Sequence, residues 1–67
     1  MSVYKKIEIV GTSKKSFAEA TRVAVATAAK SVRNLGWFEV VEQRGSIKNG
    51  QVKEFQVTVR IGFTVEP

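Results

Sequence analysis

Cysteine and histidine are both absent from the 67 residues of this chain, and its single proline is the last residue. The lack of cysteine excludes disulfides and thiolate metal ligands. The lack of histidine removes the commonest metal ligand and the commonest general base. Nothing is left to activate a serine or threonine, and the glutamates form no obvious acid–base pair. We therefore expect no catalytic residues, no enzymatic activity and no metal site.

Long apolar runs are also missing. No segment approaches the roughly 18 apolar residues of a membrane span, and no apolar signal region is visible near the N-terminus. These absences predict a cytoplasmic protein without a membrane partner. We expect one domain over residues 1–67. A domain this small buries only about 60% of its unfolded surface. Since disulfides are excluded and no metal site is expected, oligomerisation is the remaining means of stabilisation.

Acidic residues are outnumbered, with eleven Lys and Arg against six acidic residues and a formal net charge of +5. This balance favours an anionic partner, such as nucleic acid or a phosphate-bearing small molecule. The charges are scattered and form no run, so ordinary surface solubility explains them equally well.

What the chain does contain is the pattern of one strand, one helix and two further strands. The β-branched segment Val3–Val10 predicts a strand, which Gly11-Thr12-Ser13 breaks. Ser16 and Glu19 form a capping box, from which a helix should run to about Asn34. The apolar stripe of this helix is mostly alanine, so it can approach a sheet closely. The stripe consists of Phe17, Ala20, Ala24, Ala28, Val32 and Leu35.

The two remaining strands are Trp37–Ile47 and Gln51–Val65, and the Asn49-Gly50 turn between them is typical of a type I′ hairpin. The fold class is therefore α+β: a β-α-β-β unit with a three-stranded antiparallel sheet packed on one helix. A two-residue turn fixes the register. The last strand alternates, with Phe55, Val57, Val59, Ile61, Phe63 and Val65 on one face. The expected pairs on the helix side are Phe38–Ile61 and Val40–Val59, which would form a core layer beneath the helix. Those on the other side are Trp37–Gly62, Glu39–Arg60 (a favourable charge pair), Val41–Thr58 and Gln43–Gln56.

This register has one uncomfortable consequence near the turn. It places Glu42 and Arg44 on the helix side, where charged side chains are costly to bury. A bulge at Gly45 would shift the strand by one residue and relieve the problem. The face of Arg44 therefore stays open.

The only tryptophan, Trp37, falls on the face away from the helix, beside Glu39, Gln56 and Arg60. One interpretation is an anchor that packs against another subunit. The other is an aromatic platform for a ligand ring, with Gly62 opposite to leave space for it. The periodicity does not separate these two interpretations.

Two further motifs give weaker signals. The segment Gly11–Ser16 loosely resembles a phosphate loop but lacks the Gly-Lys-Ser/Thr ending of a Walker A motif, so a turn and helix cap explain it. Lys14 and Lys15 at the helix N-terminus could still attract an anion. Single-stranded nucleic acid is an alternative ligand for a basic sheet. The predicted outer face offers one Trp and no basic stripe interleaved with aromatics, so this remains the second hypothesis.

Several runs together resemble the dodecin family over nearly the whole chain. They are Ile7–Ser13, Trp37–Val40, Gln43–Gly45, Phe55–Val59 and Ile61–Phe63. The resemblance implies a β-α-β-β subunit that assembles as a hollow homododecamer with cubic symmetry. It also implies a protein that binds, stores and sequesters flavins without catalysis. The flavin would be FMN, riboflavin or FAD, stacked in pairs between Trp residues on two-fold axes. Some bacterial members also bind coenzyme A.

The resemblance also implies roles for three residues. Trp37 would stack on the flavin ring, Gln56 would hydrogen-bond its polar edge, and Arg44 would approach the phosphate of FMN. The sequence departs from the family at Thr64, where many members have Arg, which argues against coenzyme A. It also has Ser46 where His is frequent.

The register constrains how such a site is built. Trp37 faces Gly62, which is six residues from Gln56 along one strand, or roughly 20 Å. One ring therefore cannot contact both side chains within one subunit. If both contact flavin, the site combines residues from at least two subunits. A shell without a physiological ligand is a third hypothesis.

Overall fold

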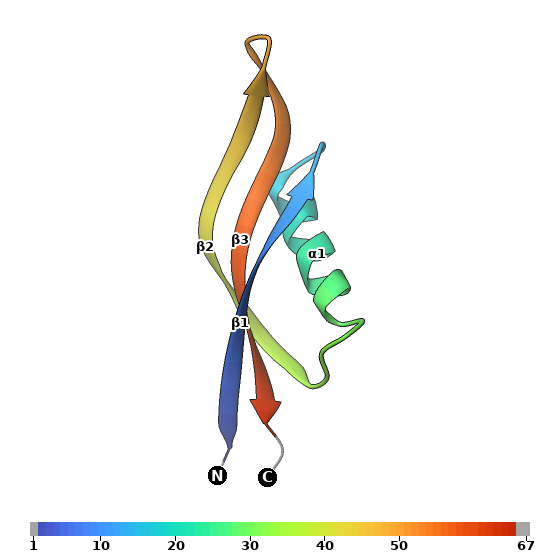
Figure 1. The fold of residues 1–67 in the computed structure, drawn as a ribbon, viewed down its shortest axis with the longest axis vertical. Coiled ribbons are helices and arrows are strands. Elements are labelled where there is room, and N and C mark those ends of the chain that lie inside the picture. Colours follow the sequence, from blue (N-terminus) through green and yellow to red (C-terminus); the bar gives the residue numbers. More distant parts are fainter. Residues whose placement is uncertain (1, 66–67) are drawn as a thin grey trace.

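The computed structural model describes residues 2–65 as one sheet and one helix (Figure 1). The elements are β1 (Val3–Ser13), α1 (Phe17–Ala28), β2 (Leu35–Lys48) and β3 (Gln51–Val65). The strands form an antiparallel sheet in the order β1-β3-β2, so the last strand is the central one. The predicted α+β class and β-α-β-β order are confirmed.

Gly11 brings the helix close to the sheet. It pairs with Val57 in the β1–β3 ladder. A Cβ atom on Gly11 would overlap the carbonyl oxygen of Ala20 and would lie 2.7 Å from the Cβ atom of Ala24. Glycine inside a strand often marks such a close approach. The prediction that β1 breaks at Gly11 was therefore wrong, and the strand continues to Ser13.

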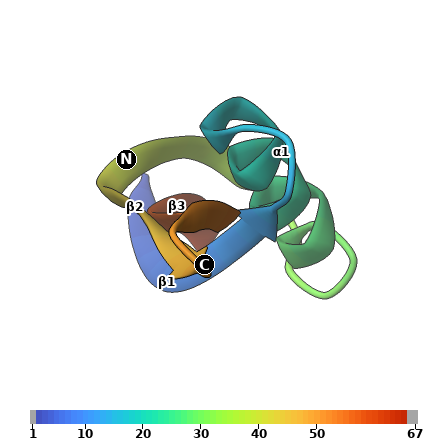
Figure 2. The same cartoon turned by 90° about the horizontal axis from the view of Figure 1, so that it is seen from above.

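A small core forms where the alanine stripe of α1 meets the central strand. Its buried members are Ala20, Ala24, Ala28, Val57, Val59 and Ile61. Phe17 and Phe55 pack edge to face beside it, with ring centroids 5.0 Å apart. The alternation predicted for β3 is confirmed, since its buried valines and isoleucine all face the helix. Seen from above (Figure 2), α1 lies against one side of the curved sheet.

Both ends of α1 have identifiable causes. At the start, the Ser16 hydroxyl accepts a hydrogen bond of 3.0 Å from the Glu19 backbone N–H, which confirms Ser16 as the N-cap. The Ser16 backbone N–H donates to Ser13 Oγ at 3.4 Å, where the predicted capping box has the Glu19 side chain. The helix ends at Ala28, earlier than the expected end near Asn34. Ser31 N–H donates to the Ala28 carbonyl in a tighter turn. Asn34 then adopts a φ of 63°, which no helix includes, and turns the chain into β2.

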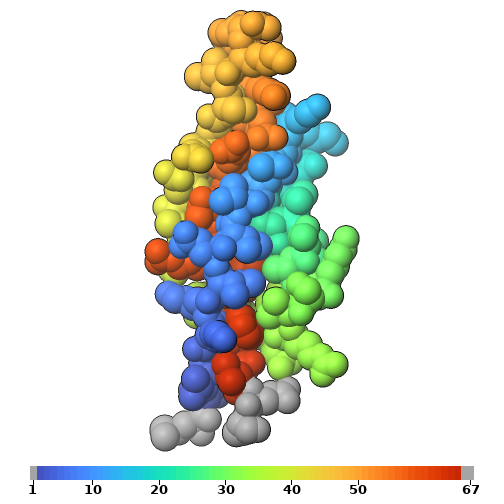
Figure 3. Space-filling view, in the orientation of Figure 1, coloured from blue at the N-terminus to red at the C-terminus, as the bar shows by residue number. Residues whose placement is uncertain are grey.

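The β2–β3 hairpin extends well past the helix, and the molecule is 51 Å long (Figures 1 and 3). At its tip, Asn49 and Gly50 have φ values of 53° and 75°. Two positive φ values are the signature of a type I′ turn, which confirms the predicted turn.

The helix packs against β1 and β3 and leaves most of β2 without cover. Phe38 and Val40 lie opposite Ile61 and Val59, on the helix side of the sheet. They nevertheless remain 51% and 45% exposed. The prediction that they form a core layer beneath the helix was wrong, because one narrow helix cannot cover three strands. An apolar strip of β2 is left uncovered within this single chain.

Two irregularities change the register in the middle of the hairpin. The predicted pairs hold from Trp37–Gly62 to Val40–Val59, after which Val41 has no partner. The shift is cancelled between Ser46 and Ile47, where the extra residue lies on β3. The predicted pairs Val41–Thr58 and Gln43–Gln56 were therefore wrong. The observed pairs between the irregularities are Glu42–Thr58, Gln43–Val57, Arg44–Gln56, Gly45–Phe55 and Ser46–Glu54.

The first irregularity settles the face of Arg44. It acts as a β-bulge at Val41 and not at Gly45 as expected. Beyond Val41 the side chains of β2 change faces, so Arg44 lies opposite Gln56, on the side away from α1. The predicted need for a bulge was correct, and only its position was wrong.

Candidate functional site

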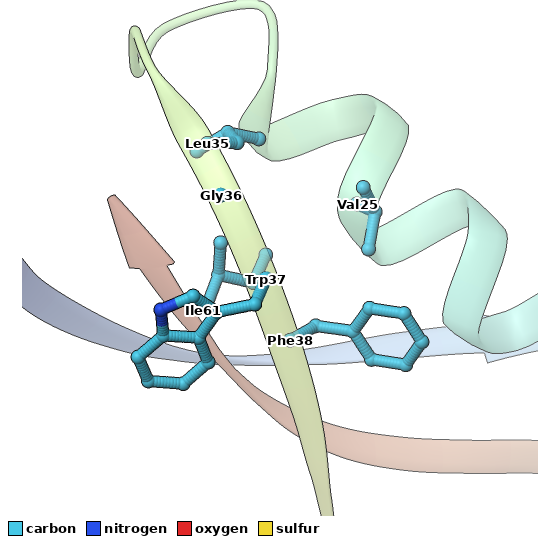
Figure 4. A pocket seen from close by; sticks show the side chains of 6 residues that line it. All are labelled: Val25, Leu35, Gly36, Trp37, Phe38 and Ile61. Carbon is cyan, nitrogen blue, oxygen red and sulfur yellow. The ribbon is translucent and has the colours of Figure 1, made fainter. Parts of the chain in front are cut away.

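The Trp37 indole lies flat over Gly62, on the face of the sheet away from the helix. A Cβ atom on Gly62 would overlap Cε2 and Cζ2 of the indole and would lie 2.7 Å from Cδ2. Figure 4 shows the Trp37 ring and the Phe38 ring on opposite sides of β2, with Phe38 directed toward α1. The prediction that Trp37 lies on the uncovered face, opposite Gly62, is confirmed.

The indole is flanked by two side chains of β1. The Tyr4 ring centroid lies 6.3 Å from the indole centroid, with the planes tilted by 50°. Lys6 Nζ lies 5.7 Å from the indole centroid and 3.2 Å from Glu39 Oε1. Trp37 remains 41% exposed. The backbone at Gly62 thus supports one face of the indole, and the exposed part of the ring makes a flat aromatic platform.

Arg44 and Gln56 form a second cluster farther along the hairpin. Arg44 Nε donates a hydrogen bond of 3.2 Å to Gln56 Oε1. Gln56 Nε2 donates one of 3.0 Å to Glu54 Oε1, so both ends of the amide are held. The side chain of Arg44 is 66% exposed and lies 3.9 Å from Glu42 Oε1. Its guanidinium therefore remains accessible to an anionic ligand group.

The structure brings Arg44 and Gln56 together and leaves Trp37 apart from them. Trp37 pairs with Gly62 and Arg44 pairs with Gln56. These two positions of β3 are six residues apart, or roughly 20 Å along an extended strand. A single flat ring cannot contact both clusters in one copy of the chain.

The charges beside the platform are paired across three strands. Arg60 Nε donates a hydrogen bond of 2.8 Å to Glu8 Oε1. Arg60 lies opposite Glu39 as predicted, but the carboxylate of Glu39 pairs with Lys6 instead. The pKa of Arg60 is raised above its ordinary value, first by the hydrogen bond to Glu8 and then by the negative charges of Glu8 and Glu39. The expected Glu39–Arg60 ion pair is replaced by two pairs with β1.

The contribution of β1 to the platform was missed by sequence reasoning. Tyr4 and Lys6 reach Trp37 only because β1 pairs with β3 so that Lys6 lies opposite Gly62. The hairpin turn predicts the β2–β3 register, whereas no short turn joins β1 to its neighbour. The available signal was the spacing of Tyr4 and Lys6, which places both side chains on one face of a strand.

Comparison with known proteins decides the family. A family model described as Dodecin matches residues 3–66. The chain belongs to the dodecin family. It is 50% identical over 64 residues to the dodecin of Thermus thermophilus, over 96% of this chain and 93% of that dodecin. A solved structure of the dodecin from Streptomyces coelicolor matches with a TM-score of 0.94 and 42% identity, over 98% of this chain and 94% of that one.

A more distant relative is named for a metal. The calcium dodecin of Mycobacterium tuberculosis is 33% identical over 67 residues, which are 100% of this chain and 94% of that protein. Its crystal structure, described as having a novel calcium-binding site, matches with a TM-score of 0.84. In residues 2–65 of the present chain, no three acidic side chains gather in a way that could hold a metal ion.

Membership of the dodecin family identifies the chain as a protein that binds small ligands. The family and the fold expected from the resemblance are confirmed, and the nucleic-acid alternative gains no support from these relatives. Within residues 2–65 the only helix is too short to cross a membrane.

Thr64 pairs with Tyr4 at the end of the sheet near the platform. The Ser46 hydroxyl is buried and has no hydrogen-bond partner among the described residues.

Proposed function

We propose that this dodecin binds, stores and sequesters flavins without catalysing a reaction. One observation carries the proposal: the Trp37 indole rests on Gly62 and offers its other face on the open side of the sheet. An electron-rich ring held in this way suits the electron-poor, planar isoalloxazine ring common to FMN, riboflavin and FAD. Aromatic stacking adds about 0.5–1.5 kcal/mol to the contribution of the buried area.

The separation of the two clusters supports a site shared between subunits. In our proposal, two symmetry-related Trp37 residues enclose a pair of stacked flavins, and Gln56 reaches the polar edge of a ring from a neighbouring copy. The Gln56 amide suits this role, because it carries both a donor and an acceptor. The nearby guanidinium of Arg44 would bind the phosphate of FMN through charge-assisted hydrogen bonds.

The uncovered apolar surface supports assembly. Phe38 and Val40 on β2, and Ile47 and Val52 near the hairpin tip, are all exposed in a single chain. A chain of this size is marginally stable alone, so burying these side chains against other copies would stabilise it. We propose the homododecameric shell implied by the family resemblance. Coenzyme A is not included in the proposal, because Thr64 offers no charge for its phosphates.

A flavin titration tests the function. We expect FMN or riboflavin added to the ligand-free protein to lose its fluorescence, because the stacked indole gives the excited ring an electron. A native mass measurement should show twelve copies with bound flavin. The function would be wrong if the flavin fluorescence stayed unchanged at all protein concentrations.

Trp37→Ala tests the platform itself. Removing a buried aromatic anchor typically costs at least 2 kcal/mol, so we expect an affinity loss of at least about 30-fold for either flavin. Lys5→Ala, on the other face of β1, is the control and should bind as the unchanged protein does. The native mass of both variants should remain that of the full assembly. An unchanged affinity of Trp37→Ala would remove the stacking role.

A further inference from the structure

Lys6 is a charged group close to the indole, and its position follows from the sheet. Lys6 and Trp37 lie on either side of Gly62, one on β1 and the other on β2. Because Gly62 has no side chain, the indole occupies the space above it, and Lys6 lies opposite Gly62 on the neighbouring strand. The Lys6 ammonium lies 5.7 Å from the indole centroid. A cation at this distance is attracted by the negative face of an aromatic ring.

The ammonium is also tethered. Lys6 Nζ donates a hydrogen bond of 3.2 Å to Glu39 Oε1. Glu39 follows Trp37 by two residues on β2, so it lies on the same face of the sheet. Lys6 thus joins the two outer strands across the glycine of the central strand. The ion pair and the indole therefore form one cluster, of which sequence reasoning placed Trp37 and Glu39 on one face but missed Lys6.

We propose that Lys6, through its ion pair with Glu39, is a positioning residue that holds the Trp37 indole flat for ligand stacking. The Tyr4 ring flanks the indole, and the Gly62 backbone supports it from below. The role of the lysine in ligand binding rests on the proposed function, but its effect on the indole does not. The ring is pre-organised before a ligand arrives, so less conformational freedom is lost on binding.

The charge arrangement makes this role distinguishable from direct phosphate binding. Lys6 forms the closer ion pair, at 3.2 Å from Glu39, whereas Arg44 lies 3.9 Å from Glu42 and is the more exposed, at 66% of its side chain compared with 48% for Lys6. A positioning residue acts on the ring platform that FMN and riboflavin share. Its loss should therefore weaken the binding of FMN and of riboflavin equally. The loss of a residue that binds phosphate would weaken the binding of FMN alone.

Lys6→Met tests the proposal, because methionine keeps a flexible apolar stem and removes the charge. The ligand-free variant should show a weaker near-ultraviolet circular dichroism signal from its single tryptophan. Riboflavin and FMN should both bind about threefold to tenfold more weakly, as expected for an exposed ion pair with a cation–π contact. Lys6→Arg should restore both signals, since it retains the charge.

The control is Arg60→Met. Arg60 forms the shorter ion pair on the same face, with Glu8, and its side chain is similarly exposed. Arg60 pairs with Glu8, and the cation that lies over the indole is Lys6. The loss of Arg60 should therefore leave the dichroism and the riboflavin affinity unchanged. Glu39→Gln should reproduce Lys6→Met, and the double variant should be no worse than either, because both remove one interaction.

The outcomes separate the two proposals. If the unchanged protein binds riboflavin and Lys6→Met binds equally well with the same dichroism, the positioning role is wrong and the function stands. If no variant binds flavin but Lys6→Met still loses the tryptophan signal, the function is wrong and the positioning role stands. A loss confined to FMN would make Lys6 a phosphate ligand and would overturn the proposal.

Discussion

The two clusters on the open face of the sheet are held in different ways. At one end, the Trp37 indole rests on the backbone of Gly62, so a rigid main chain sets its position. At the other end, Arg44, Gln56 and Glu54 hold one another through one exposed and one partly buried hydrogen bond. The close packing of the indole on Gly62 leaves no room for an added atom, whereas the hydrogen-bonded side chains of the second cluster can adjust. Substitutions should therefore have large effects at the first cluster and graded effects at the second.

The largest effect is expected from Gly62→Ala. The new Cβ atom would overlap the indole, so the ring must leave its position. We expect the affinity for riboflavin to fall by at least about 30-fold, as for the loss of an aromatic anchor. Titration with riboflavin measures this loss, and native mass measurement checks that the assembly persists.

Gly36→Ala is the matched control for Gly62→Ala. A Cβ atom there would meet its nearest neighbour, Cε2 of Tyr4, at 3.6 Å, which is ordinary van der Waals contact. Riboflavin should bind this variant as it binds the unchanged protein. If Gly62→Ala also bound normally, the indole would not depend on the backbone beneath it, and the contrast between the two clusters would disappear.

The two clusters also differ in how well the sequence predicts them. The Asn49-Gly50 turn predicted the Trp37–Gly62 pair correctly, although two irregularities lie between the turn and that pair. The extra residue of β2, Val41, and the extra residue of β3, Lys53, cancel each other. Neither is a glycine, so no local signal marks them. Only the unfavourable placement of Glu42 and Arg44 indicated that a bulge was needed.

The remaining errors share a cause in tertiary packing. Gly11 was predicted to end the first strand, but its lack of a side chain instead allows the helix to pack close to that strand. Phe38 and Val40 were expected in the core because their pattern is apolar, but the helix does not extend over β2. A periodic pattern shows which face of a strand is apolar, and it does not show whether the same chain covers that face.

An intermediate effect is expected from Arg44→Glu. The substitution removes an accessible cation and adds a like charge near the FMN phosphate. Hydrogen bonds to charged groups contribute about 1.5–3 kcal/mol, so FMN should bind at least about tenfold more weakly. Riboflavin carries no phosphate, but Arg44 also donates to Gln56 Oε1. The affinity for riboflavin should therefore fall only about twofold to threefold, as expected for a less firmly held amide.

Parallel titrations of the two flavins measure the difference. Added salt should reduce the advantage of FMN over riboflavin in the unchanged protein, because the guanidinium is exposed. If Arg44→Glu reduced the affinity for both flavins equally, Arg44 would not bind the phosphate.

The smallest effect is expected from Glu54→Gln, and its sign depends on the ligand. Glu54 accepts the hydrogen bond that orients the Gln56 amide. Glutamine keeps an acceptor but makes a weaker bond, so riboflavin should bind about twofold to threefold more weakly. The same change removes a negative charge near Arg44, which favours the phosphate of FMN. The ratio of FMN to riboflavin affinity should therefore rise.

Glu42→Gln separates these two contributions. Glu42 Oε1 lies 3.9 Å from Arg44 Nε, whereas the Gln56 amide donates to Glu54. Its neutralisation should strengthen FMN binding and leave riboflavin unchanged, because the charge changes while the amide stays oriented. If Glu54→Gln changed the FMN and riboflavin affinities in the same way as Glu42→Gln does, Glu54 would act only through its charge. The charges of the second cluster would then act independently, and the Gln56 amide would not need the hydrogen bond to Glu54 to contact the ring.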